Sequence, residues 1–356
     1  MNIRLDLGIK GLIPEWKSLL SRDSLAQDAV AGLTVATIAV PLSLAISMAS
    51  NREPGAGLVT AIVGSIVAAM FGGTRLAVTG PAAGMAVLIA EVVERHGVGG
   101  LIIVGCLCGL LQMLTGIFNL GRVIKLVPPP VVKGFLDGIG AIIFVSQLPR
   151  AFGLPQPKDS HLLDILKHVG GLVHQAKPES MIITLVTIFF VFGLPRFNAR
   201  IPAALVGVLV PTLVVAIFQV ETPLIGKIPS SLPMPKIPSL PEMSEMWGIA
   251  GMGVSVYALA SLETLLSSAV VDDMTKTRHN PDQELIGQGM ANVVVSLFGG
   301  IPVTGVIARS ALNVHSGAKT RRSAIFHAVV LIGVVYVFSD YMAKIPVAAL
   351  AGVLLA

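Results

Sequence analysis

Two ionisable residues, Glu263 and Arg309, lie inside apolar segments of this 356-residue chain. Charged side chains are costly in lipid, and they usually face a partner, a water-filled cavity or a transport route. Glu263 lies near the middle of its segment, where a carboxyl group could pair with Arg309 or carry a proton. Arg309 could add positive charge to a cavity, or its side chain could extend to the membrane surface.

A short Gly-rich motif occurs once in each half of the chain. Phe71-Gly72-Gly73 precedes Thr79-Gly80, and Phe298-Gly299-Gly300 precedes Thr304-Gly305. Each motif leads into an apolar run, and we expect a short helix to begin there, with Pro81 in the first turn of the earlier one. Two helix N-termini that meet at membrane depth direct unpaired N–H groups and positive dipole ends at one point. The motif therefore predicts an anion site, against the alternative of ordinary Gly and Pro packing between membrane helices.

The composition indicates that most of this chain is solvated by lipid. Hydrophobic residues make up 54% of the sequence and charged residues 13%, whereas soluble domains average about 25% charged residues. The net charge of +5 is spread over short loops and only 5% of residues are aromatic, which excludes a nucleic-acid partner. Cys106 and Cys108 lie in an apolar run without other cysteines, so we expect no metal site and no cofactor.

Twelve apolar segments predict an all-α, polytopic membrane protein. A helix needs about 20 residues to span a bilayer, and broken helices can be shorter. The segments are 29–49, 57–71, 79–94, 98–120, 126–148, 180–195, 201–219, 247–271, 284–298, 303–314, 323–339 and 345–356. Residues 161–175 are amphipathic and predict an interfacial helix. Six prolines in 221–246 predict an extended, exposed linker.

The loops predict the orientation and the division of the chain. Lys and Arg are more numerous on the side that carries the N-terminus, which places this terminus in the cytoplasm. An odd number of spans precedes the linker, so the second half enters the membrane inverted, as in an inverted repeat. We divide the chain into a cytoplasmic segment (1–27), a first repeat of seven spans (28–220), the extracytoplasmic linker (221–246) and a second, incomplete repeat of five spans (247–356). Two further spans would complete the second repeat, which predicts a truncated chain.

Three stretches resemble the SulP family of anion transporters, the sulfate permeases and their relatives: DAVAGLTVATIAVPLSLA (28–45), ASLETLLSSAVVDDMTKTRHNPDQELIGQGMAN (260–292) and FGGIPVTGVIARSALNVHSGAKTRRS (298–323). The resemblance implies a seven-plus-seven inverted repeat, with a core (gate) domain and a scaffold domain. It also implies elevator-like motion, a homodimer and a multi-pass protein of the bacterial plasma membrane. Sulfate or bicarbonate is the expected substrate. The chain would lack the last two spans and the cytoplasmic STAS domain of the family.

The resemblance also assigns residues to the site. Glu263 matches the position of the coupling ion, and a glutamate there favours a proton. Two departures leave the substrate open, because many members have Phe in place of Ile46 and Ser in place of Ala308. The expected anion contacts are Pro41, Leu42, Ser43, Ala82, Ala83, Gly84, Thr304, Gly305, Val306, Ala308 and Arg309.

Two alternatives differ in class from a transporter. Asp272-Asp273 could bind Mg²⁺ in a membrane enzyme that acts on a diphosphate lipid. Such sites need a second acidic cluster, and Asp282 and Glu284 are too near in sequence to supply an independent one, so we do not expect an enzyme. A sensor or motor that binds an anion without net flux is the other alternative.

Overall fold

A computed structural model of the chain describes residues 9–20, 23–121, 129–155, 165, 167, 169–198, 201–235 and 243–356. These residues are mostly helical. The first half contains α1 (Ile9–Leu20), α2 (Leu25–Ala49), α3 (Pro54–Phe71), β1 (Thr79–Pro81), η1 (Ala83–Met85), α4 (Ala86–Ile117), α6 (Pro129–Ala151), α8 (Val169–Gln175), α9 (Pro178–Phe197) and α10 (Ala203–Phe218). The second half contains α11 (Met243–Thr275), α12 (Pro281–Leu297), β2 (Val303–Gly305), α13 (Ile307–His315), α14 (Arg322–Met342) and α15 (Val347–Leu355).

The outer surface of the helices is the surface of a membrane-embedded protein. Within the described part of the chain, six helices are long and apolar enough to cross a membrane: α2, α3, α4, α9, α11 and α14. The other predicted spans fall on α6, α10, α12, α13 and α15. Phe189 on α9 is 67% exposed and Ile217 on α10 is 71% exposed. Exposed apolar area costs roughly 25 cal/mol per Å² in water, and this cost disappears when the surrounding solvent is lipid.

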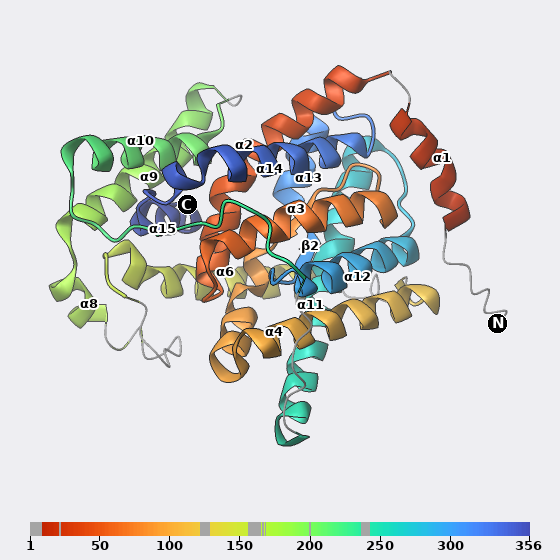
Figure 1. The fold of residues 1–356 in the computed structure, drawn as a ribbon, viewed down its shortest axis with the longest axis horizontal. Coiled ribbons are helices and arrows are strands. Elements are labelled where there is room, and N and C mark those ends of the chain that lie inside the picture. The colour runs from red at the N-terminus through yellow and green to blue at the C-terminus, as the bar shows by residue number, and fades with distance from the viewer. Residues whose placement is uncertain are drawn as a thin grey trace.

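The helices form two neighbouring groups (Figure 1). One contains α6, α8, α9, α10 and α15, and the other contains α3, α4, α11, α12, α13 and α14. Helix α2 contacts α3 and α14 in the second group and α10 and α15 in the first. In the second group α4 and α12 cross at Gly109 and Gly289, where a methyl group on Gly109 would lie 2.4 Å from the Gly289 carbonyl oxygen. Small residues at such a crossing let two membrane helices approach backbone to backbone.

The Thr-Gly part of each Gly-rich motif lies in a strand where a helix was expected. β1 and β2 pair in an antiparallel sheet with Thr79 opposite Gly305 and Pro81 opposite Val303. The expected helix starts at residues 79 and 303 are therefore wrong, and Pro81 is in a strand rather than in a first helical turn. Each strand satisfies part of the other's backbone at membrane depth, where an unpaired polar group is expensive. The helices begin later, at Ala86 after the η1 turn and at Ile307.

Two further segments depart from regular helix. Gly97 interrupts α4 with φ 63° and ψ −166°, a conformation that glycine adopts readily, and the expected break between spans 79–94 and 98–120 falls there. Residues 221–235 contain no helix, and Leu224 forms an isolated bridge with Pro346. Ile228 is only 7% exposed, so this part of the linker packs on the helices. Residues 126–128, 161–164, 166, 168 and 236–242 of the expected segments lie outside the described residues.

Candidate anion-binding site

The β1–β2 pair brings two helix starts together. After β2 the chain stays extended at Val306, whose N–H donates to the Val78 carbonyl oxygen over 3.0 Å. α13 then begins at Ile307 without a side-chain cap. After β1 the chain is extended at Ala82 and turns through η1 into α4, again without a side-chain cap. The first N–H groups of a helix have no partner within it, so both helix starts can offer donors to a ligand.

Polar side chains from the surrounding helices fix the two strands. The Asn292 side chain accepts from the Val303 N–H (2.7 Å) and donates to the Val303 carbonyl (3.1 Å). The Ser65 hydroxyl donates to the Thr79 carbonyl (2.6 Å), and the Gln288 amide donates to the Thr79 hydroxyl (2.7 Å). The sequence analysis missed these positioning residues. Their signal was an amide or hydroxyl group inside an apolar segment, a weaker version of the signal that identified Glu263.

A cavity of about 170 Å³ lies at the helix starts. A water molecule occupies about 30 Å³ in the liquid, so the cavity has room for a small inorganic anion with some water. Seven of the residues expected at the site line it: Ala82, Ala83, Glu263, Thr304, Gly305, Val306 and Ala308. Ile307, within the expected stretch from Gly305 to Arg309, and Leu266, which was not expected, also line it.

Glu263 reaches the wall of this cavity from α11. Its Oε2 accepts a hydrogen bond from the Thr304 hydroxyl over 3.3 Å. Gly84 does not line the cavity but makes room for the carboxyl group, because a methyl group at this position would lie 2.0 Å from Glu263 Oε1. Among the described residues no ion pair joins Glu263 to Arg309. The structure therefore contradicts pairing of these two residues, and the proton-carrying alternative stays a prediction.

Arg309 lies in the first turn of α13 and is completely buried. Its Nη2 donates to the Ser43 hydroxyl over 3.0 Å, whereas Nε and Nη1 have no hydrogen-bond partner in the described part of the chain. A methyl group on Gly80 would lie 2.2 Å from Nη1, so the guanidinium is packed against the β1 backbone. Extension of this side chain to the membrane surface is excluded. A buried guanidinium without a carboxylate partner is costly, and a bound anion would offset that cost.

The three expected residues of α2 differ in their positions. Ser43 is buried and accepts the hydrogen bond from Arg309. Pro41 is buried within α2, and Leu42 packs between two apolar clusters of the core. Neither Pro41 nor Leu42 lines the cavity. Ile46 is buried beside Ala82, where the resemblance led us to expect an aromatic side chain in many relatives.

His327 is a buried polar residue that the sequence analysis missed. It lies on α14, is fully buried, and neither ring nitrogen has a hydrogen-bond partner within the described residues. A lone histidine in the apolar segment 323–339 was the available signal. Its position in the core accounts for its burial but leaves the two ring nitrogens without a protein partner.

The first residue of the aspartate pair contacts a histidine, His279. Asp272 Oδ2 lies 2.7 Å from His279 Nδ1 and accepts from the His279 N–H over 3.0 Å. In the part of the chain that the structure describes, no group of three or more His, Cys, Asp or Glu side chains could hold a metal ion. Among the described residues, the Mg²⁺ alternative finds no second acidic cluster of the kind that it needs.

The fold is that of a helical membrane protein, and a cavity lies where two of its helices begin, a place where secondary transporters typically bind their substrates. Comparison with known proteins agrees with this class. The model of the sulfate permease family matches residues 25–356, and the chain belongs to this family. It is a family of transporters rather than of enzymes.

Individual relatives and a solved structure are similar over most of the chain. YvdB of Bacillus subtilis, whose name provisionally assigns it to sulfate transport, is 32% identical over 92% of this chain and 63% of its own length. The bicarbonate transporter BicA of Synechocystis is 32% identical over 93% of this chain and 60% of its own length. The transmembrane domain of a cyanobacterial BicA superposes with a TM-score of 0.89 at 30% identity, over 94% of this chain and 89% of that structure. The chain thus spans less than two thirds of the length of these two relatives.

Proposed function

We propose that this chain forms the transport unit of a secondary active transporter that moves a small inorganic anion across the bacterial plasma membrane. The cavity between the two helix starts, with Glu263 on its wall and Arg309 behind β1, is the observation that carries the proposal. Sulfate and bicarbonate are the two substrates to test, because YvdB is named for the first and BicA for the second.

The electrostatics of the cavity favour an anion for two reasons. Helix N-termini present N–H donors and the positive end of the helix dipole, and both helix starts lack a side-chain cap. Arg309 adds a full positive charge that no carboxylate neutralises among the described residues. In a site surrounded by apolar side chains these contributions are screened much less than in water.

Glu263 gives the cavity a means of coupling the anion to a proton. An ionised carboxylate on the wall repels a bound anion, and a protonated carboxyl group does not. Binding of the proton and binding of the anion therefore favour each other, and by linkage the effect is equal in both directions. In our proposal the two move together as a symport.

The alternating-access part of the proposal is an elevator. The antiparallel β1–β2 pair relates a segment of 28–220 to a segment of 247–356 in opposite directions, as expected for a seven-plus-seven inverted repeat. We propose that the group containing α3, α4 and α11–α14 moves as the core domain against α6, α9, α10 and α15 as the scaffold. A cytoplasmic N-terminus and a homodimer joined through the scaffold belong to the same proposal.

Uptake into proteoliposomes tests this function. We expect radiolabelled sulfate or bicarbonate to accumulate when the outside is more acidic than the inside, and to equilibrate without accumulation when the pH gradient is removed. Unlabelled substrate should compete with the labelled anion. Competition between sulfate and bicarbonate identifies the anion that the protein prefers. Saturable binding without uptake would instead favour the sensor or motor alternative, and absence of both binding and uptake would refute the proposal.

A further inference from the structure

A second cavity, of about 540 Å³, lies against α1 and shares no lining residue with the anion site. It lies between α1, the loop after α3, the end of α11 and the loop between α13 and α14. Its volume is within the 300–1,000 Å³ that small-molecule sites typically occupy. Two acidic side chains, Glu15 and Asp272, and four basic ones line it, which gives the lining a formal charge of +2. The basic residues are Arg75, Arg278, Lys319 and Arg321.

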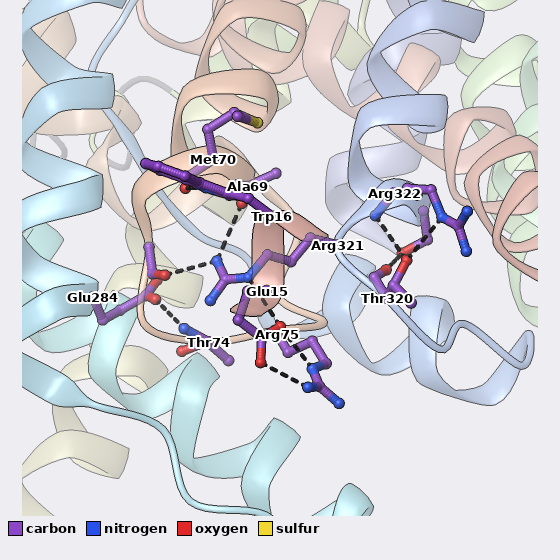
Figure 2. Close-up of polar contacts among 12 residues, drawn as sticks. Glu15, Trp16, Ala69, Met70, Thr74, Arg75, Glu284, Thr320, Arg321 and Arg322 are labelled. Atoms are coloured by element: carbon purple, nitrogen blue, oxygen red, sulfur yellow. Dashed lines mark hydrogen bonds and ion pairs between the residues drawn. The ribbon is translucent and has the colours of Figure 1, made fainter. Parts of the chain in front are cut away.

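Glu15 occupies the space between two of these arginines (Figure 2). Arg75 donates to both of its oxygens, from Nε to Oε2 over 2.9 Å and from Nη2 to Oε1 over 2.6 Å. Arg321 Nε lies 3.5 Å from Glu15 Oε2. This forked, charge-assisted geometry is the one with which arginine binds carboxylates and phosphates. The carboxylate of α1 therefore fills an anion-binding arrangement that the rest of the molecule provides.

Arg321 has partners besides Glu15, and two other basic side chains of the lining, Arg278 and Lys319, are exposed. Arg321 is 3% exposed in its side chain, and its Nη1 donates to the carbonyl oxygens of Ala69 (3.1 Å) and Gly72 (2.7 Å). The Arg278 and Lys319 side chains are exposed, with no ion-pair partner in the described part of the chain. If Glu15 left the cavity, the formal charge of the lining would rise to +3.

Helix α1 is also attached to the end of α3 through Trp16. The Trp16 indole N–H donates to the Met70 carbonyl over 2.7 Å, and its ring meets Phe71 edge-on with centroids 6.1 Å apart. Both partners belong to the last turn of α3. Glu15 and Trp16 are adjacent in sequence, so release of the carboxylate would also disturb the environment of the indole.

We propose that this cavity is a binding site for phosphoryl groups, separate from the transport site, and that a bound phosphoryl group displaces Glu15 and releases α1. A monocarboxylate cannot compete well, because Glu15 is tethered at high effective concentration. A displacing ligand must carry two or more negative charges, and a phosphate monoester or diphosphate supplies them with oxygens that match several arginines and a lysine at once. The source is either a free phosphate compound or the headgroup of a phosphomonoester lipid.

Two measurements on the chain in nanodiscs test the proposal. The chain has two tryptophans, Trp16 and Trp247, so Trp247→Phe leaves Trp16 as the only indole and its emission reports on α1. Binding of radiolabelled pyrophosphate in phosphatidylcholine discs, at constant ionic strength set with chloride, gives the affinity for the free ligand. Discs that contain phosphatidic acid, without pyrophosphate, test the lipid source by the same emission change.

We expect pyrophosphate or phosphatidic acid to shift the Trp16 emission to longer wavelength. Arg278→Gln combined with Lys319→Gln should weaken pyrophosphate binding at least about tenfold, whereas Lys17→Gln, which removes an exposed charge of α1 outside the cavity lining, should leave it unchanged. Glu15→Gln should tighten binding, because the competing carboxylate is gone. Arg309→Ala should leave the Trp16 response intact, whether or not the chain transports anions.

Three outcomes would overturn the proposal. One is the absence of both pyrophosphate binding and any emission change in either kind of disc. Another is binding that the Arg278→Gln and Lys319→Gln pair does not weaken, or that Glu15→Gln weakens. The third is loss of the response in Arg309→Ala, which would make this cavity an entrance to the transport site rather than a separate site.

Discussion

At the anion site each charged side chain contacts a neutral partner, Glu263 the hydroxyl of Thr304 and Arg309 the hydroxyl of Ser43. At the α1 cavity the opposite holds, because Glu15 is hydrogen-bonded to Arg75 and ion-paired with Arg321. The buried charges of the anion site are unfavourable until an ion of opposite charge binds. In the α1 cavity the carboxylate of Glu15 is already neutralised by arginines of the protein. A site that must bind and release an anion in each cycle benefits from charges that no neighbouring side chain neutralises. A helix attached at the periphery benefits from an ion pair with the rest of the protein.

The largest effect that distinguishes the two regions is expected for arginine removal. Arg309→Ala should weaken sulfate or bicarbonate binding roughly ten- to a hundredfold, since a charge-assisted hydrogen bond contributes about 1.5–3 kcal/mol. The folded protein should not lose thermal stability, because among the described residues the buried guanidinium has no carboxylate partner. Arg75→Ala removes the same side chain from the other region and should leave anion binding unchanged. Calorimetric titration measures the anion affinity of each variant, and thermal unfolding measures its stability. Unchanged anion binding in a folded Arg309→Ala variant would contradict a role of Arg309 in the anion site.

A smaller effect is expected from crowding Glu263. Gly84→Ala places a methyl group 2.0 Å from Glu263 Oε1, and overpacking of a buried site costs about 1–3 kcal/mol. The displaced carboxyl group should lower the rate of pH-driven anion uptake about fivefold or more. Gly251→Ala is the matched control, because it lies on the same helix as Glu263 and, beyond its chain neighbours and that helix's own backbone, no described atom lies within 4 Å of the added group. Equal uptake rates in the two variants would show that the space beside Gly84 is not needed for the function of Glu263.

The smallest effect is a pH dependence of the α1 attachment. The hydrogen bond from Arg75 lowers the pKa of Glu15 below its ordinary 4.5. The ion pair therefore stabilises α1 above this ordinary value, and the contribution is lost as the pH falls through the lowered pKa. Arg75 is 54% exposed in its side chain, so about 0–1 kcal/mol is at stake. Trp16 emission in a Trp247→Phe background should change as the pH falls below the ordinary carboxyl value of 4.5 and through the lowered pKa of Glu15. An unchanged titration in Glu15→Gln would show that another group is responsible.

The residues of the anion site could be predicted because they break a strong pattern. Glu263 and Arg309 are ionisable groups in apolar segments, and the repeated Gly-rich motif occurs beside Arg309. The structure places the Thr-Gly pairs of both copies in one β-sheet, with Thr79 opposite Gly305. The resemblance to SulP transporters located most of the cavity wall as well, although Leu266 was absent from that expectation.

The strands and the α1 cavity could not be predicted because both depend on contacts that are distant in sequence. A Thr-Gly pair before an apolar run suits a helix start as well as a strand, and only the pairing of β1 with β2 decides between them. Arg75 and Glu15 are separated by 60 positions, and each lies in an ordinary polar segment. Likewise, only the packing of α2 against α13 showed that Arg309 contacts Ser43 rather than Glu263.

Glu263→Gln decides whether the anion and a coupled proton share one cavity through Glu263. The glutamine mimics the protonated carboxyl group permanently, while both helix starts and Arg309 remain. Counterflow exchange of labelled for unlabelled anion in proteoliposomes should survive, and accumulation driven by a pH gradient should disappear. Uptake that requires Na⁺ and is lost in the same variant would show a different coupling ion. Full pH-driven accumulation by Glu263→Gln would contradict the account and leave Glu263 as a structural residue.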